Sequence, residues 1–75
     1  MIDLVELRRA AGMTQMQLAD ALATTQGQVS RLERQSDMLL STLSAYLTAL
    51  GVQARLVVLV DGTTITQEIT EARQR

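Results

Sequence analysis

The sequence predicts a mainly α-helical fold, in which four short helices are followed by a small β element. Apolar residues recur at three- to four-residue spacing as far as Leu50, which is the helical period. The residues after Gly51 are instead β-branched and apolar, and a turn signal interrupts them. With 75 residues, the chain is expected to form one compact unit. Residues 1–51 make its helical part, and residues 52–75 make a β-hairpin with a short charged tail.

The first helix is expected over about residues 3–11. Asp3 can cap its start, because a short carboxylate side chain accepts hydrogen bonds from the free amides of the first turn. Leu4, Leu7 and Ala11 repeat at helical spacing and form its inward face. Gly12 is expected to end it.

Two further helices are expected over about residues 15–23 and 26–34, joined by a tight turn. Each opens with a capping box, in which a Thr hydroxyl and a Gln amide satisfy free amides of the helix start: Thr14 with Gln17, and Thr25 with Gln28. The outer face of the later helix carries amide, hydroxyl and guanidinium groups: Gln26, Gln28, Ser30, Arg31 and Arg34. Amides and guanidinium groups suit bidentate hydrogen bonds to base edges, so this helix is predicted to read DNA.

A loop over residues 35–40 leads to a fourth helix, which is expected to begin with Ser41 as its cap and to end at Leu50. Gly51 then stands where helices favour a left-handed residue. One stripe of this helix is expected to close the core: Leu43, Tyr46, Leu47 and Leu50.

A β-hairpin is expected over residues 54–70, with Asp61-Gly62 as its turn signal. Two registers compete. A two-residue loop pairs Val58 with Ile65 and Arg55 with Glu68. A four-residue loop matches apolar residues better: Val60 with Ile65 and Leu56 with Ile69. We favour the first register, because Asp-Gly is the stronger local signal.

The hairpin points to a homodimer. A lone two-stranded ribbon is marginal in water, and its first strand is apolar on both sides. Helices that cover one face would leave the other exposed, so a second copy of the chain is expected to cover it or to pair with a free edge. The predicted dimer interface is Leu56, Val57, Val58, Leu59 and Val60. In the alternative, both faces are covered within one chain.

The composition excludes several kinds of site. The chain has no Cys and no His, lacks a Gly-rich phosphate loop and has no spaced carboxylates, so we expect no cofactor, no metal and no enzymatic activity. Met13 and Met16 are expected to fill the core. No apolar run reaches the roughly 18 residues of a membrane span. Residues 1–6 hold two acidic and no basic residues, which argues against a signal peptide. The lack of Cys fits a cytoplasmic protein.

The net charge of −1 is unusual for a DNA-binding domain, which is often strongly basic. All seven basic residues are arginine, which suits contacts to phosphate and guanine. A local positive patch is therefore expected from Arg8, Arg9, Arg31 and Arg34. In the alternative, these arginines form an ordinary solvated surface without a binding role.

These patterns resemble the phage-repressor/Cro type of helix-turn-helix protein, also called the XRE family. The resemblance is carried by residues 7–15, 18–19, 26–34 and 43–51. It implies a four-helix, repressor-like bundle in which Gln26 reads adenine, while Gln15 holds a phosphate and braces Gln26. It also implies a structural salt bridge between Arg8 and Glu33.

The resemblance further implies two sets of DNA contacts. The base-reading set is Gln26, Gly27, Gln28, Ser30 and Arg31. The phosphate-binding set is Arg9, Gln15, Thr25, Arg34, Ser41 and Thr42.

Three positions depart from the family pattern. Many relatives have glycine where Ala23 and Gln35 stand, so Ala23 is strained if its φ is positive, and the exit from the recognition helix differs. Gly27 weakens the recognition helix. It either permits a close approach of DNA or is simply tolerated.

The remainder of the chain resembles small antitoxins of the host-inhibition-of-growth group of type II toxin–antitoxin operons, through residues 38–43, residues 49–51 and the strand before Asp61-Gly62. This finer resemblance implies a dimeric repressor that binds a near-palindromic operator in double-stranded DNA and neutralises a cognate toxin protein. Two alternatives remain open. One is a partner-binding module that mainly neutralises a toxin, and the other is a stand-alone repressor with no toxin.

Overall fold

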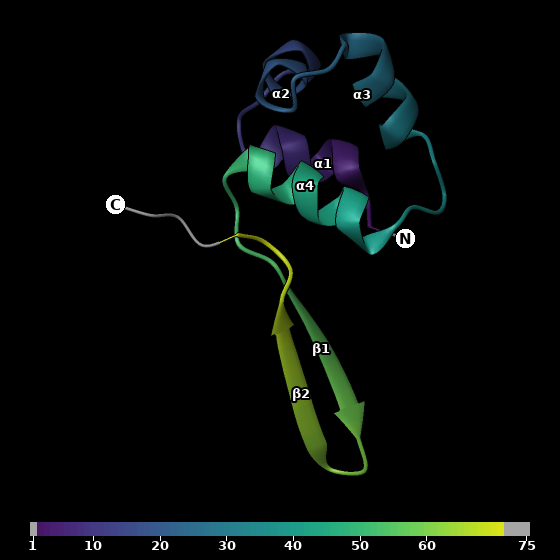
Figure 1. The fold of residues 1–75 in the computed structure, drawn as a ribbon, viewed down its shortest axis with the longest axis vertical. Coiled ribbons are helices and arrows are strands. Elements are labelled where there is room, and N and C mark those ends of the chain that lie inside the picture. The colour runs from purple at the N-terminus through teal and green to yellow at the C-terminus, as the bar shows by residue number, and fades with distance from the viewer. Residues whose placement is uncertain (1, 72–75) are drawn as a thin grey trace.

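Four helices pack around one apolar centre, and a hairpin projects away from them (Figure 1). This computed structural model describes residues 2–71, and the predicted tail at residues 72–75 lies outside that range. The elements are α1 (Leu4–Ala10), α2 (Gln15–Ala21), α3 (Gln26–Glu33), α4 (Leu40–Leu50), β1 (Arg55–Val60) and β2 (Thr63–Glu68). The core consists of Leu4, Leu18, Ala19, Val29, Tyr46, Leu47 and Leu50. The predicted order of four helices and a hairpin is confirmed.

Side chains cap the first three helices. Asp3 caps α1 by accepting a hydrogen bond from the Glu6 amide at 3.1 Å. The capping box of α2 is complete, with Thr14 and Gln17 bonded in both directions. At α3, Thr25 Oγ1 accepts from the Gln28 amide at 3.2 Å, but the described hydrogen bonds include no return bond from the Gln28 side chain. The second predicted capping box is therefore only half formed, and Gln28 stays exposed on the outer face.

The predicted cap of α4 is wrong. Leu39, in an extended conformation, is the N-cap residue and makes no side-chain cap bond, so Ser41 lies inside the first turn. The helix starts here because the Leu43 amide already donates to the Leu39 carbonyl at 3.0 Å. The first amides of α4 thus have no side-chain acceptor from the N-cap residue.

Left-handed residues follow three of the four helices. Gly12 after α1 and Gly51 after α4 have φ values of 76° and 77°, as predicted for helix-terminating glycines. Ala23 takes the same role after α2, with φ at 56°, and α2 ends two residues earlier than expected. The Thr24 amide donates to the Ala19 carbonyl at 2.9 Å, which is the long bond of a Schellman motif. The exit from α3 differs as expected, because Gln35 is not left-handed.

The hairpin adopts the register with the two-residue loop. Val58 pairs with Ile65 and Arg55 pairs with Glu68, so the prediction based on Asp-Gly is confirmed and the four-residue alternative is wrong. Asp61 and Gly62 have φ values of 45° and 81°, the positive values that a type I′ turn requires at both central residues.

Neither face of the hairpin is covered. Every residue of both strands is exposed, and Leu59 is 77% exposed. The expectation that helices cover one face is wrong, and so is the alternative in which one chain covers both. The reason is that, within the described residues, the hairpin contacts the body at its base, where Ala54 and Ile69 pack against the core and the Glu71 amide donates to Thr48 Oγ1 at 3.3 Å.

None of the helices within residues 2–71 has the length and apolar character that crossing a membrane requires.

We expect Ala23→Gly to stabilise the protein by up to about 1 kcal/mol, because glycine has no Cβ to strain at a positive φ. For a domain of this size, a gain of about 1 kcal/mol raises the melting temperature by about 4–8 °C. Circular dichroism melts measure the shift. Ala21→Gly, within the last turn of α2, is the matched control and should instead lower the melting temperature. Equal destabilisation by both changes would contradict the strain at Ala23.

Candidate nucleic-acid interface

The outer face of α3 is polar and free of contacts with the core. Val29 is 1% exposed and anchors α3 to the core, and Leu32 packs beside it. Gln26, Gln28 and Arg31 are exposed on the other side, and Ser30 is half-buried. Helix α3 lies at the end of the body remote from the hairpin (Figure 1). The predicted base-reading side chains are therefore presented together on one accessible surface.

Gly27 lies in the first turn of this face and has an ordinary helical φ. A Cβ at this position would meet nothing closer than Thr25 Oγ1 at 4.0 Å. No contact within the described residues therefore requires a glycine here.

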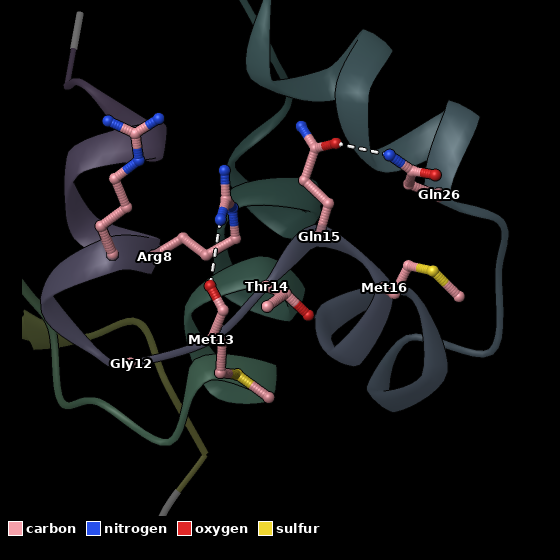
Figure 2. Close-up of a pocket in the computed structure, with 8 residues that line it drawn as sticks. Arg8, Gly12, Met13, Thr14, Gln15, Met16 and Gln26 are labelled. Carbon is pink, nitrogen blue, oxygen red and sulfur yellow. Dashed lines mark hydrogen bonds between the residues drawn. The ribbon is translucent and has the colours of Figure 1, made fainter.

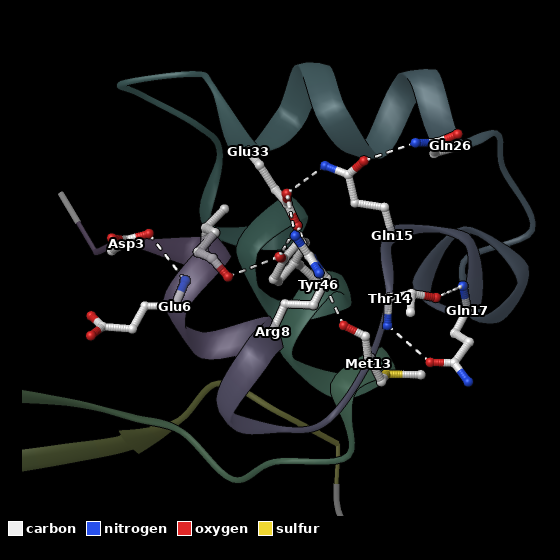
Figure 3. A network of polar contacts seen from close by, with 11 residues as sticks. Asp3, Glu6, Arg8, Met13, Thr14, Gln15, Gln17, Gln26, Glu33 and Tyr46 are labelled. Atoms are coloured by element: carbon white, nitrogen blue, oxygen red, sulfur yellow. Dashed lines mark hydrogen bonds and ion pairs between the residues drawn. The ribbon is translucent and has the colours of Figure 1, made fainter.

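A chain of amide hydrogen bonds holds Gln26 in place (Figure 3). Gln26 Nε2 donates to Gln15 Oε1 at 3.0 Å, and Gln15 Nε2 donates to Glu33 Oε1 at 2.9 Å. Gln15 is the first residue of α2 and Gln26 the first residue of α3, so the contact joins the two helix starts. The structure thus places Gln15 as the brace of Gln26, as the family resemblance implied.

Glu33 is the centre of this polar network. Its Oε2 accepts from Arg8 Nε at 2.7 Å and from the Tyr46 hydroxyl at 2.6 Å, which joins α1, α3 and α4. The Glu33 side chain is 1% exposed and the Arg8 side chain 9% exposed, so the implied salt bridge is present and buried. Arg8 Nη1 also donates to the Met13 carbonyl at 3.0 Å.

The sequence predicted Tyr46 as a core residue but did not predict that its hydroxyl belongs to the polar network. That hydroxyl lies 3.1 Å from the Leu4 carbonyl as well as 2.6 Å from Glu33. The available signal was a tyrosine among leucines on a buried stripe, since a buried tyrosine hydroxyl needs a hydrogen-bond partner.

An open groove of about 610 Å³ lies beside Gln15 and Gln26 (Figure 2). Its lining residues come from the end of α1, the turn and the starts of α2 and α3: Arg8, Arg9, Gly12, Met13, Thr14, Gln15, Met16 and Gln26. Arg9 and Gln15, two predicted phosphate ligands, thus share one groove with the predicted adenine reader. Met16 is 65% exposed, so its predicted place in the core is wrong.

The other predicted phosphate ligands lie outside this groove. Thr25, Arg34 and Ser41 are exposed, and Thr42 is half-buried. The predicted positive patch loses Arg8, because its guanidinium is buried against Glu33. Arg9, Arg31 and Arg34 remain exposed, which leaves a smaller basic surface than expected.

The family described as Helix-turn-helix matches residues 4–57, which span all four helices and the start of β1. The chain belongs to the helix-turn-helix family. This helix-turn-helix protein is of the XRE type, as the sequence patterns indicated.

Two solved structures are similar to this helix-turn-helix protein. One describes induced DNA bending by unique dimerization of HigA antitoxin, with 36% identity and a TM-score of 0.77, and the match covers 85% of this chain and 88% of the other. The second is DNA-bound antitoxin HigA3, with 34% identity and a TM-score of 0.77, and the match covers 97% of this chain and 95% of the other. No curated protein matches the sequence.

The network sets the ionisation of its members. Burial raises the pKa of Glu33, but hydrogen bonds from Arg8, Tyr46 and Gln15 outweigh burial and leave that pKa below its ordinary value. The hydrogen bond to Glu33 raises the pKa of Arg8. Burial, followed by the Glu33 contact, raises the pKa of Tyr46. At neutral pH the helix-turn-helix therefore holds a charged carboxylate–guanidinium pair and a neutral tyrosine.

The lowered pKa of Glu33 predicts a loss of stability in acid. A carboxyl with a lower pKa in the folded state contributes stability above its unfolded pKa of about 4.3, and loses it as the pH falls through the folded value. Urea denaturation between about pH 7 and pH 3 measures the free energy of unfolding. We expect Glu33→Gln to be less stable than wild type at pH 7 and to lose less stability in acid. Parallel curves for the two proteins would contradict the role of Glu33.

Proposed function

We propose that this helix-turn-helix protein is a sequence-specific DNA-binding repressor that acts as a homodimer on a near-palindromic operator in double-stranded DNA. The observation that carries the proposal is Gln26. It is exposed at the start of α3, and its amide is held by Gln15, which is held in turn by the buried Glu33. A fixed amide at the tip of an accessible helix suits bidentate pairing with N6 and N7 of adenine.

In this proposal, α3 enters the major groove of DNA. Gln26, Gln28 and Arg31 read base edges, with Gly27 and Ser30 on the same face. Arg9 and Gln15 bind phosphate from the groove beside Gln26, and the uncapped start of α4 with Ser41 and Thr42 offers amides to another phosphate. Thr25 and Arg34 complete the phosphate set. Two such helices in a dimer would enter successive major grooves about 34 Å apart.

The similarity to HigA antitoxins supports a finer assignment. The protein would be the antitoxin of a type II toxin–antitoxin operon, repress that operon and neutralise a toxin in the cytoplasm, without enzymatic activity of its own. Copurification with the product of an adjacent small gene tests this assignment. A DNA-binding protein without such a partner would be a stand-alone repressor.

The hairpin supports the dimer. Alternation along the strands places Leu56, Val58, Val60 and Ile65 on one face, and Val57 and Leu59 on the other. All six are exposed in the single chain. Exposed apolar strands with free edges are favoured sites of association, and β1 offers the longer apolar run. We infer that β1 is the centre of the interface between two copies.

We expect Gln26→Ala to weaken specific DNA binding by about 1–3 kcal/mol and to relax the preference at one base, because one bidentate contact is lost. Selection from a random DNA pool defines the operator, and gel-shift titration at fixed salt gives both specific and nonspecific Kd values. Gln53→Ala, which removes an exposed glutamine beside the hairpin base, is the control and should bind as wild type. An equal loss of specific and nonspecific affinity in Gln26→Ala would refute base reading by Gln26.

We expect Leu59→Glu to raise the dimer dissociation constant by at least about tenfold, because a buried unpaired carboxylate costs more than 1.4 kcal/mol. The folded monomer should keep its melting behaviour, since Leu59 is 77% exposed in the single chain. Sedimentation velocity over a concentration series measures the association. Ala45→Glu adds the same charge to the exposed side of α4 and should leave the dimer intact. A dimer that survives Leu59→Glu would place the interface elsewhere.

A further inference from the structure

We propose that Glu33 sets which base Gln26 reads, by fixing the orientation of two side-chain amides in series. The inference rests on the proposed function of DNA binding. Glu33 cannot itself touch DNA, because its side chain is 1% exposed beneath α1, α2 and α4. It would act through Gln15 and Gln26 as a positioning residue.

The first step is the chemistry of the carboxylate. An ionised carboxylate only accepts hydrogen bonds, whereas a glutamine amide has one accepting end and one donating end. The neighbours of Glu33 in the network all donate to it: Arg8, Tyr46 and Gln15. Gln15 must therefore turn its NH₂ group toward Glu33. The opposite orientation would set an amide oxygen 2.9 Å from a buried carboxylate oxygen.

In the second step, the orientation of the Gln15 amide fixes that of the Gln26 amide. With its NH₂ group committed to Glu33, Gln15 presents its oxygen to Gln26 at 3.0 Å. Gln26 must then direct its own NH₂ group toward Gln15. One N–H of that group and the Oε1 atom of Gln26 remain free, so the charge of Glu33 determines which end of the exposed amide is the acceptor (Figure 3).

The third step is base selection. The free N–H and Oε1 of Gln26 match the N7 acceptor and the N6 donor of adenine. Guanine presents two acceptors, N7 and O6, on the same edge. The fixed Oε1 would meet guanine O6 as acceptor against acceptor. A reversed amide would place its NH₂ group opposite guanine O6 and its oxygen opposite N7, so it would make one hydrogen bond with guanine and none with adenine. The network therefore discriminates between two purines of nearly identical shape.

The test compares operator duplexes that differ only at the base pair whose preference Gln26→Ala relaxes. In wild type, adenine should be preferred over guanine by about 5- to 150-fold. In Glu33→Gln the ratio should fall to about threefold or less, because an amide at position 33 has only one oxygen and can present its NH₂ group to Gln15. Gln15→Lys should shift the preference toward guanine, since an ammonium only donates and would reverse Gln26. Gln15 lines the open groove, so Gln15→Lys still tests the inference if Glu33→Gln does not fold.

Arg8→Met is the matched control. It breaks the same buried ion pair and destabilises the fold, but it leaves the Glu33 carboxylate as an acceptor for Gln15. The preference for adenine should therefore persist in Arg8→Met at temperatures where the protein remains folded. Wild-type preference in both Glu33→Gln and Gln15→Lys would overturn the inference while leaving DNA binding in place. If wild type selected no sequence at all, the proposed function would fail first.

Discussion

The buried carboxylate of Glu33 is the contact on which the arrangement of the helices depends. It accepts hydrogen bonds from α1 through Arg8, from α2 through Gln15 and from α4 through Tyr46, while it belongs to α3 itself. A carboxylate in an apolar core is costly unless its partners satisfy it, and no buried side-chain polar atom in residues 2–71 lacks a partner. The same group that orients the helices therefore also orients the surface amides.

Local signals predicted most of the fold. The capping residues Asp3 and Thr14, the glycines after α1 and α4, and the Asp-Gly turn each fix backbone geometry within a few residues, so one sequence suffices to identify them. The exposed polar face of α3 followed from helical spacing around Val29. The salt bridge and the contact between Gln15 and Gln26 came only from the family resemblance, because they join residues 25 and 11 positions apart.

The wrong predictions have a common cause: they depend on contacts between distant parts of the chain, which local sequence patterns do not reveal. Ser41 is a favourable cap residue, but α4 begins at Leu40 with Leu39 as its N-cap residue, so Ser41 lies inside the first turn. Met16 has the character of a core residue, yet its place in the first turn of α2 turns it toward the open groove. The apolar character of β1 was correctly recognised. Whether helices cover it depends on the direction in which the hairpin leaves the body, and no residue in the strand determines that direction.

The uncovered hairpin makes the activity of the proposed repressor depend on dose. If only the paired form buries β1 and spans two half-sites, its abundance at low concentration follows the square of the chain concentration. Halving the number of chains would then cut the paired form about fourfold. A modest change in synthesis or proteolysis would become a steep change in promoter occupancy, without any small-molecule effector. The exposed apolar strand would thus make repression sensitive to the concentration of the protein in the cell.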